Sequence, residues 1–186
     1  MKRIRQSVHA FAGSALAVVI AGVVALLTGQ PWLFPSLGPA VMLHLEKPDS
    51  PESSPRNTLI GHGVALLAGY GFLVACGLTD NPPVLQEGMS GPRIVAAAGS
   101  LAVTALVLVL LKASHPPAGA TTLIVSLGLL TTPTQLLIAA GAVVLVTAVD
   151  WLYGQVSDRP MPVWAAPERS PEEGGHRGGP DRRPVG

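Results

Sequence analysis

The sequence has few charged residues and only one cysteine. Charged side chains make up 12% of the chain and hydrophobic residues 48%, whereas a typical soluble domain carries about 25% charged residues. The formal net charge of +1 offers no basic surface for binding nucleic acid. Cys76 has no second cysteine with which to form an internal disulfide. This composition excludes an ordinary soluble domain and predicts an integral membrane protein.

Patterns typical of enzymes are also missing. The sequence contains no HExxH or GxSxG pattern, no carboxylate pair inside an apolar run, and no cysteine-rich metal pattern. His115 follows Ser114 directly, but no acidic third partner lies nearby in the sequence. We therefore expect no enzyme activity, no metal and no cofactor.

Four apolar runs are long enough, or nearly long enough, to cross a bilayer, which takes about 20 helical residues. They are Val8 to Thr28, Thr58 to Leu78, Ile94 to Leu111, and Thr134 to Trp151. The first run follows the basic start MKRIRQ, as in a signal peptide. It is longer than a signal core of about 7 to 15 residues, and no small-x-small cleavage site closes it, so we interpret it as a span.

The composition changes after Trp151. The segment from Ser157 to Gly186 is rich in proline, glycine and mixed charge, so it cannot bury enough apolar surface to order itself. We predict a transmembrane domain over residues 1–156 and a disordered cytoplasmic tail over residues 157–186.

Two short segments, Pro31 to Leu45 and Pro116 to Leu130, break the apolar pattern with prolines and glycines. One offset, the 78 residues between Pro55 and Pro133, also superposes Ser36 on Ser114 and Pro39 on Pro117. We therefore predict an all-α helical bundle of two internal repeats, at about residues 8–78 and 93–153. Each repeat has a long helix, a short Pro/Gly-interrupted helix and a long helix, which gives four long spans plus two short membrane-embedded helices.

The charges bear on whether the short helices cross the membrane or re-enter from one side. If they cross, the second repeat is inverted, and only Arg93 lies outside. MKRIRQ, Lys47, Arg56, Lys112 and Arg159 are then cytoplasmic. Re-entrant short helices would move Lys47, Arg56 and Lys112 to the outside. The charge count favours six crossings, with both termini cytoplasmic and the protein in a bacterial-type cytoplasmic (inner) membrane.

Broken helices at matched places in two repeats indicate the central site of a transporter, although kinked packing helices are the alternative. Pro116 and Pro117 suit a helix start, so we expect the free N–H groups of Ala118, Gly119 and Ala120 to bind an anion. His62 and His115 can carry a proton within apolar surroundings. The candidate substrate-binding residues are Ser36, Gly38, Pro39, Arg56, Asn57, His62, Ser114, His115, Pro116, Pro117, Ala118, Gly119 and Thr121.

Other polar residues have simpler interpretations. We expect His44 at the membrane interface, because Glu46 and Lys47 follow it, and we place Asp150 at the interfacial end of the last span. Arg56 either faces an anion or anchors the chain at the membrane surface. Asn57 is the expected N-cap of its helix.

Three motifs resemble signatures of the HPP family of integral membrane proteins. They are PSLGPAVML, SPRNTLIGH and SHPPAGATTLI, and the similarity runs from roughly Phe11 to Tyr153. The His-Pro-Pro of the family name would be His115, Pro116 and Pro117. The resemblance implies a small four-span transporter, with nitrite or a similar anion as substrate. A non-transporting membrane scaffold or sensor subunit is the alternative function. The expected partners are the lipid bilayer, a small anion, protons and a second copy of the chain.

Overall fold

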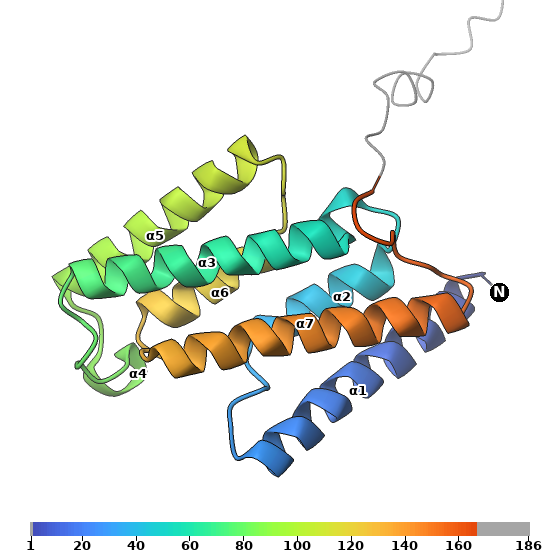
Figure 1. The fold of residues 1–186 in the computed structure, drawn as a ribbon, viewed down its shortest axis with the longest axis horizontal. Coiled ribbons are helices and arrows are strands. Elements are labelled where there is room, and N and C mark those ends of the chain that lie inside the picture. Colours follow the sequence, from blue (N-terminus) through green and yellow to red (C-terminus); the bar gives the residue numbers. More distant parts are fainter. Residues whose placement is uncertain (1, 167–186) are drawn as a thin grey trace, which may run out of the picture.

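The computed structural model describes residues 2–166, and every regular element in this part of the chain is a helix (Figure 1). Four long helices are apolar enough to cross a membrane, namely α1 (Lys2–Thr28), α3 (Pro55–Ala75), α5 (Gly91–Leu110) and α7 (Pro133–Val156). The shorter elements are α2 (Leu37–Glu46), η1 (Pro51–Ser53), α4 (Val84–Glu87) and α6 (Pro117–Ser126). The predicted all-α membrane fold is confirmed.

The third helix of each predicted repeat begins in the same way. In α3 the Ser54 hydroxyl accepts a hydrogen bond from Asn57 N at 3.3 Å, and in α7 the Thr132 hydroxyl accepts one from Gln135 N at 3.2 Å. A proline follows each cap. Proline is tolerated at this position because the N–H of a first-turn residue has no partner within the helix. The two prolines are related by the offset of the repeat. The prediction that Asn57 is the N-cap is wrong, since the cap must precede Pro55.

The two repeats run in opposite directions between two ends of the bundle (Figure 1). The near face is the end at which α1 begins and α7 ends, and a hydrogen bond from the Tyr153 hydroxyl to His9 O at 3.1 Å joins these helices there. The far face is the opposite end, at which α1 and α3 end and α5 and α7 begin. Helices α1 and α3 therefore run from near to far, and α5 and α7 run from far to near.

In each repeat, an extended segment and the short helix that follows it lead together from one face of the bundle to the other. Helices α2 and α6 have 10 residues each, or about 15 Å, which is half of a hydrocarbon core of about 30 Å. The chain leaves α1 at the far face, and α2 ends at the near face, where Gln6 Nε2 donates to Glu46 O at 3.4 Å. Helix α6 runs the other way and ends beside α4, with Val84 N donating to Leu127 O at 3.0 Å. This arrangement agrees with the crossing interpretation of the short segments.

Small residues allow α3 to approach α6 closely. Ala65 is fully buried between Gly61 and Gly69 on one face of α3. A Cβ atom on Gly61 would lie 2.8 Å from the His115 Cβ, and one on Gly69 would lie 2.9 Å from Thr122 O. The backbone of α6 and the loop before it therefore rest directly on this face.

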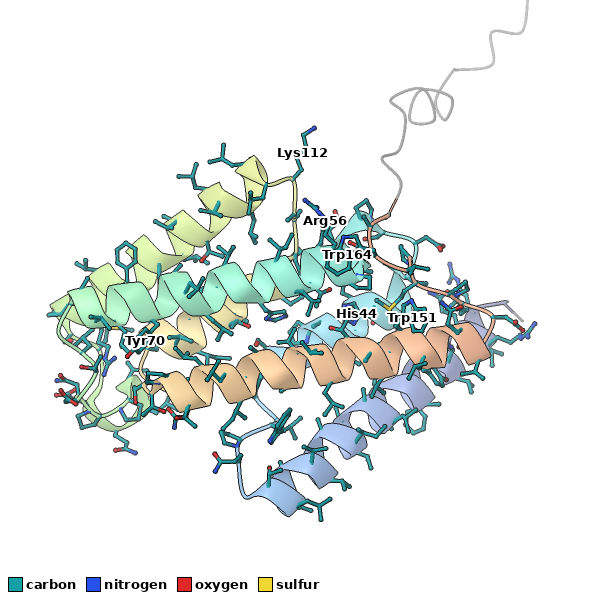
Figure 2. All side chains as sticks on the ribbon, viewed as in Figure 1. His44, Arg56, Tyr70, Lys112, Trp151 and Trp164 are labelled. Carbon is teal, nitrogen blue, oxygen red and sulfur yellow. The ribbon has the colours of Figure 1, made fainter. Side chains whose placement is uncertain are left out.

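The described part of the chain continues beyond α7. We call residues 157–166 the strap. The Met161 side chain in the strap is 3% exposed, and Trp164 O accepts a hydrogen bond from Arg56 N at 2.9 Å (Figure 2). The packed structure thus continues past the predicted domain boundary at residue 156. Residues 167–186 of the predicted tail lie outside the described residues.

Candidate functional site

Polar side chains gather in the interior where α2, α3, α6 and α7 meet. Seven of them are no more than 1% exposed, namely Ser36, His44, Thr58, His62, His115, Thr121 and Asp150. Burying polar groups is costly unless they are hydrogen-bonded, and intramembrane polar residues are functional candidates for that reason. We call these seven residues the polar cluster.

One chain of hydrogen bonds in the polar cluster joins both repeats. The Ser36 and Thr121 hydroxyl oxygens are 2.6 Å apart, and Thr121 Oγ1 lies 2.7 Å from His62 Nδ1. His62 Nε2 lies 3.2 Å from His115 Nε2, and His115 Nδ1 lies 2.8 Å from Glu52 O. The chain therefore leads from the start of α2 in the interior to η1 near the near face.

The direction of these hydrogen bonds follows from the chemistry of their two ends. The Glu52 carbonyl only accepts, so His115 Nδ1 must carry the hydrogen. With both rings neutral, His62 donates to His115, Thr121 donates to His62, and Ser36 donates to Thr121. A single set of tautomers thus satisfies the whole chain.

A second group in the polar cluster pairs His44 with Asp150. His44 Nδ1 lies 2.8 Å from Asp150 Oδ2, and His44 Nε2 lies 2.9 Å from the Thr58 hydroxyl. The His44 ring centroid is 6.1 Å from that of His115, which places the two groups side by side. The sequence analysis left His44 and Asp150 out of the candidate site, whereas the structure buries both side chains inside the bundle, toward the near-face ends of α2 and α7.

Helical periodicity was the signal for these two missed residues. His44 follows Leu37 and Val41 on the buried face of α2, and Asp150 follows Val143 on the buried face of α7. Positions three, four or seven residues apart share a helix face, so each side chain points inward.

The structure brings only part of the predicted site together. Ser36, His62, His115 and Thr121 belong to the polar cluster, and buried Asn57 donates from its side chain to Ser114 O at 3.2 Å. Pro117 and Ala118 are buried at the start of α6. By contrast, Pro39 is exposed, and a Cβ on Gly38 would meet nothing within 4 Å.

Arg56 does not face the polar cluster. Its guanidinium donates to Leu111 O at 3.1 Å and to Lys112 O at 3.2 Å, and thereby ties the start of α3 to the end of α5. Figure 2 shows Arg56 at the near face, beside Trp164. Arg56 therefore joins two helix ends at the near face and takes no part in the polar cluster.

Two of the three amides predicted to be free at the start of α6, those of Ala118 and Gly119, already have partners. Ala118 N donates to His115 O at 3.0 Å, and Gly119 N donates to Pro116 O at 3.1 Å. A tight turn at the two prolines uses these donors, so they are not free to bind an anion.

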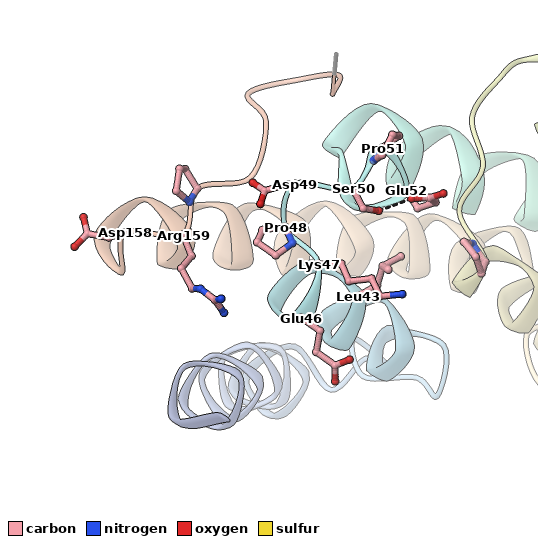
Figure 3. Close-up of a pocket in the computed structure, with 12 residues that line it drawn as sticks. Leu43, Glu46, Lys47, Pro48, Asp49, Ser50, Pro51, Glu52, Asp158 and Arg159 are labelled. Carbon is pink, nitrogen blue, oxygen red and sulfur yellow. Dashed lines mark hydrogen bonds between the residues drawn. The ribbon is translucent and has the colours of Figure 1, made fainter. Parts of the chain in front are cut away.

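Two cavities adjoin the His-Pro-Pro segment. One of about 830 Å³ opens at the near face and has Pro116 in its lining (Figure 3). Its charged lining has four carboxylates, Glu46, Asp49, Glu52 and Asp158, against the cations Lys47 and Arg159. A smaller cavity of about 290 Å³ is mostly apolar and lies along α5, with Ser114, His115, Pro116 and Gly119 in its lining. The His115 segment thus separates an acidic hollow from an apolar one.

Long apolar helices combined with inverted, broken short helices define an integral membrane protein with a buried polar centre. The family model described as HPP, transmembrane region, matches residues 1–162. The chain therefore belongs to the HPP transmembrane family, which confirms the resemblance of its motifs. Comparison with curated proteins and with solved structures finds no match.

Proposed function

We propose that this protein is a membrane transporter for a small anion, with nitrite as the first candidate, and that a proton crosses with the anion. The observation that carries the proposal is the buried hydrogen-bonded chain of Ser36, Thr121, His62 and His115. It lies where two half-length helices from inverted repeats meet. In transporters of known architecture, such helices form the substrate site near the middle of the membrane.

Proton coupling follows from the cost of burying charge. An anion in a dry site needs a counter-charge, and a proton on His62 or His115 supplies one. The hydroxyls of Ser36 and Thr121 supply further hydrogen-bond donors. The acidic hollow at the near face attracts protons and repels a free anion. These features favour a proton–anion symporter over an open anion channel.

The hydrogen-bond chain also offers a way to pass a proton from the interior toward the near face. When Ser36 receives a proton, each donor hands its own hydrogen on, from Ser36 to Thr121, from Thr121 to His62 Nδ1, and from His62 Nε2 to His115 Nε2. Every bond in the chain is then reversed, and the added charge lies on His115, at the end of the chain closer to the near face.

We place the near face in the cytoplasm and the protein in a cytoplasmic membrane. The near face holds the basic start of α1, Lys47 and Arg56, and Lys112 extends from it (Figure 2). Cytoplasmic loops carry an excess of such residues.

Uptake into liposomes tests the proposal. Purified protein should take up nitrite above the level of empty vesicles when the outside is acidified, and the lumen should acidify with it. His62→Asn and His115→Asn should reduce uptake to the level of empty vesicles. His9→Asn should retain it, because the His9 ring stacks on Tyr153 outside the hydrogen-bond chain.

The outcomes separate the two parts of the proposal. A protein that moves neither nitrite nor nitrate nor formate is not the transporter proposed. Nitrite uptake that leaves the lumen pH unchanged and ignores the external pH retains transport but overturns proton coupling.

A further inference from the structure

Arg93 is a buried cation that the proposed proton pathway does not use. It lies in the first turn of α5, and its side chain is 1% exposed. Its Nη2 donates to Pro82 O at 2.6 Å, whereas Nε and Nη1 have no hydrogen-bond partner among residues 2–166. No acidic side chain in the same part of the chain forms an ion pair with it. Because a guanidinium stays charged, such burial favours a ligand of opposite charge.

The surroundings of Arg93 add to its preference for an anion. The start of α5 carries the partial positive charge of a helix N-terminus. The guanidinium lies against the end of α6, where a Cβ on Gly128 would lie 2.7 Å from Arg93 Nη1. Gly128 also has a φ of +84°. Glycine is therefore favoured there both by the short distance to the guanidinium and by the backbone conformation. The absence of this one methyl group makes room for the guanidinium.

A stripe of buried hydroxyls leads from the polar cluster toward Arg93. Thr104 and Thr122 join α5 to α6, with their hydroxyl oxygens 3.0 Å apart. These helices run in opposite directions, so one further turn on each brings Ser100 and Ser126 to the same level. Both serines are fully buried, and Ser126 Oγ has no partner among the described residues. Arg93 lies on the same face of α5, two turns beyond Ser100.

We infer that Arg93 is the centre of a second anion-binding site, at the far end of the α5–α6 seam. The site takes a small oxyanion of the nitrite class, held by charge-assisted hydrogen bonds from the guanidinium. One part of the inference rests on the proposed function, namely that this site lies on the path of the transported anion. That path continues through Ser126, Ser100 and the threonine pair to the polar cluster. Binding at Arg93 itself stands apart from transport.

The loop before α5 covers the site. Pro82 O accepts from Arg93, and Val84 N donates to Leu127 O at 3.0 Å. No residue of α4 is buried, so little apolar contact holds this cover in place. Its opening exposes the guanidinium at the far face.

Thermal unfolding of the purified full chain in detergent tests the site. The unfolding midpoint is measured against sodium nitrite, with sodium gluconate at equal ionic strength as the reference. The measurement uses His62→Asn/His115→Asn as the background, because this double variant lacks the two histidines of the proposed central site, and its midpoint should rise and saturate. Added to this background, Arg93→Gln should raise the nitrite concentration for half of this effect by at least about tenfold, and Arg93→Lys and Ser126→Ala should raise it less. Arg3→Gln removes an exposed cation and should leave it unchanged.

The double variant His62→Asn/His115→Asn separates this inference from the proposed function, because it removes the two histidines of the proposed central site and leaves Arg93 intact. A nitrite response that is absent from the double variant, or that survives in it after Arg93→Gln is added, overturns the Arg93 site. If the variant with Arg93→Gln does not fold, an unchanged response after both Arg93→Lys and Ser126→Ala has the same meaning. Loss of nitrite uptake by the double variant with an intact nitrite response shows that the Arg93 site binds independently of transport.

Discussion

At the scale of single residues, the buried pair of His44 and Asp150 makes a sharp prediction about stability. Replacing His44 with leucine leaves the Asp150 carboxylate without its donor, and Asp150 Oδ1 already has no partner among the described residues. We expect His44→Leu to lower the free energy of unfolding by about 3 to 5 kcal/mol, because it strands a charge in the interior. Unfolding of purified protein in a detergent titration measures this loss.

The double variant is the control for this prediction. His44→Leu combined with Asp150→Leu removes the stranded charge together with its partner, so most of the lost stability should return. If the two single losses simply add, the histidine and the aspartate do not interact, and the pair has no role of its own in the bundle.

At the scale of elements, the α3–α6 contact depends on the absence of side chains on one face of α3. A methyl group on Gly69 would lie 2.8 Å from the Val125 Cβ and 2.9 Å from Thr122 O, and a backbone atom cannot rotate away. We expect Gly69→Ala to destabilise the protein by about 1 to 3 kcal/mol. It should also reduce transport, because α6 carries Thr121 to the hydrogen-bond chain.

Gly71→Ala is the matched control in the same helix. A Cβ on Gly71 would meet nothing within 4 Å, so this change should be neutral or stabilise α3 by up to about 1 kcal/mol. The free energies of unfolding of the two variants, measured under the same conditions, test this prediction. Equal effects of the two alanines would show that α6 does not depend on close approach at Gly69.

At the scale of the whole molecule, the long helices were predictable and the polar cluster only in part. Each long helix is a local apolar run, and the starts of α3, α5 and α7 are marked by a cap and a proline that can be read from the sequence. Hydrogen-bond partners are a tertiary property: His44 and Asp150 are 106 residues apart, and no local pattern pairs them. The amides of α6 were mispredicted because the proline turn uses donors that a regular helix start leaves free.

The strap makes a prediction about the whole chain. It runs from the end of α7 to the start of α3, where Trp164 O accepts from Arg56 N, and it buries the Met161 side chain. A chain that ends after Val156 should lose about 2 kcal/mol of stability, roughly the contribution of one buried methionine. A chain that ends after Ala166 keeps these contacts and should unfold and transport nitrite as the full chain does. A scaffold or sensor that acts through residues 167–186 would instead lose its function in both truncated chains, so nitrite uptake by the longer one separates the two functions.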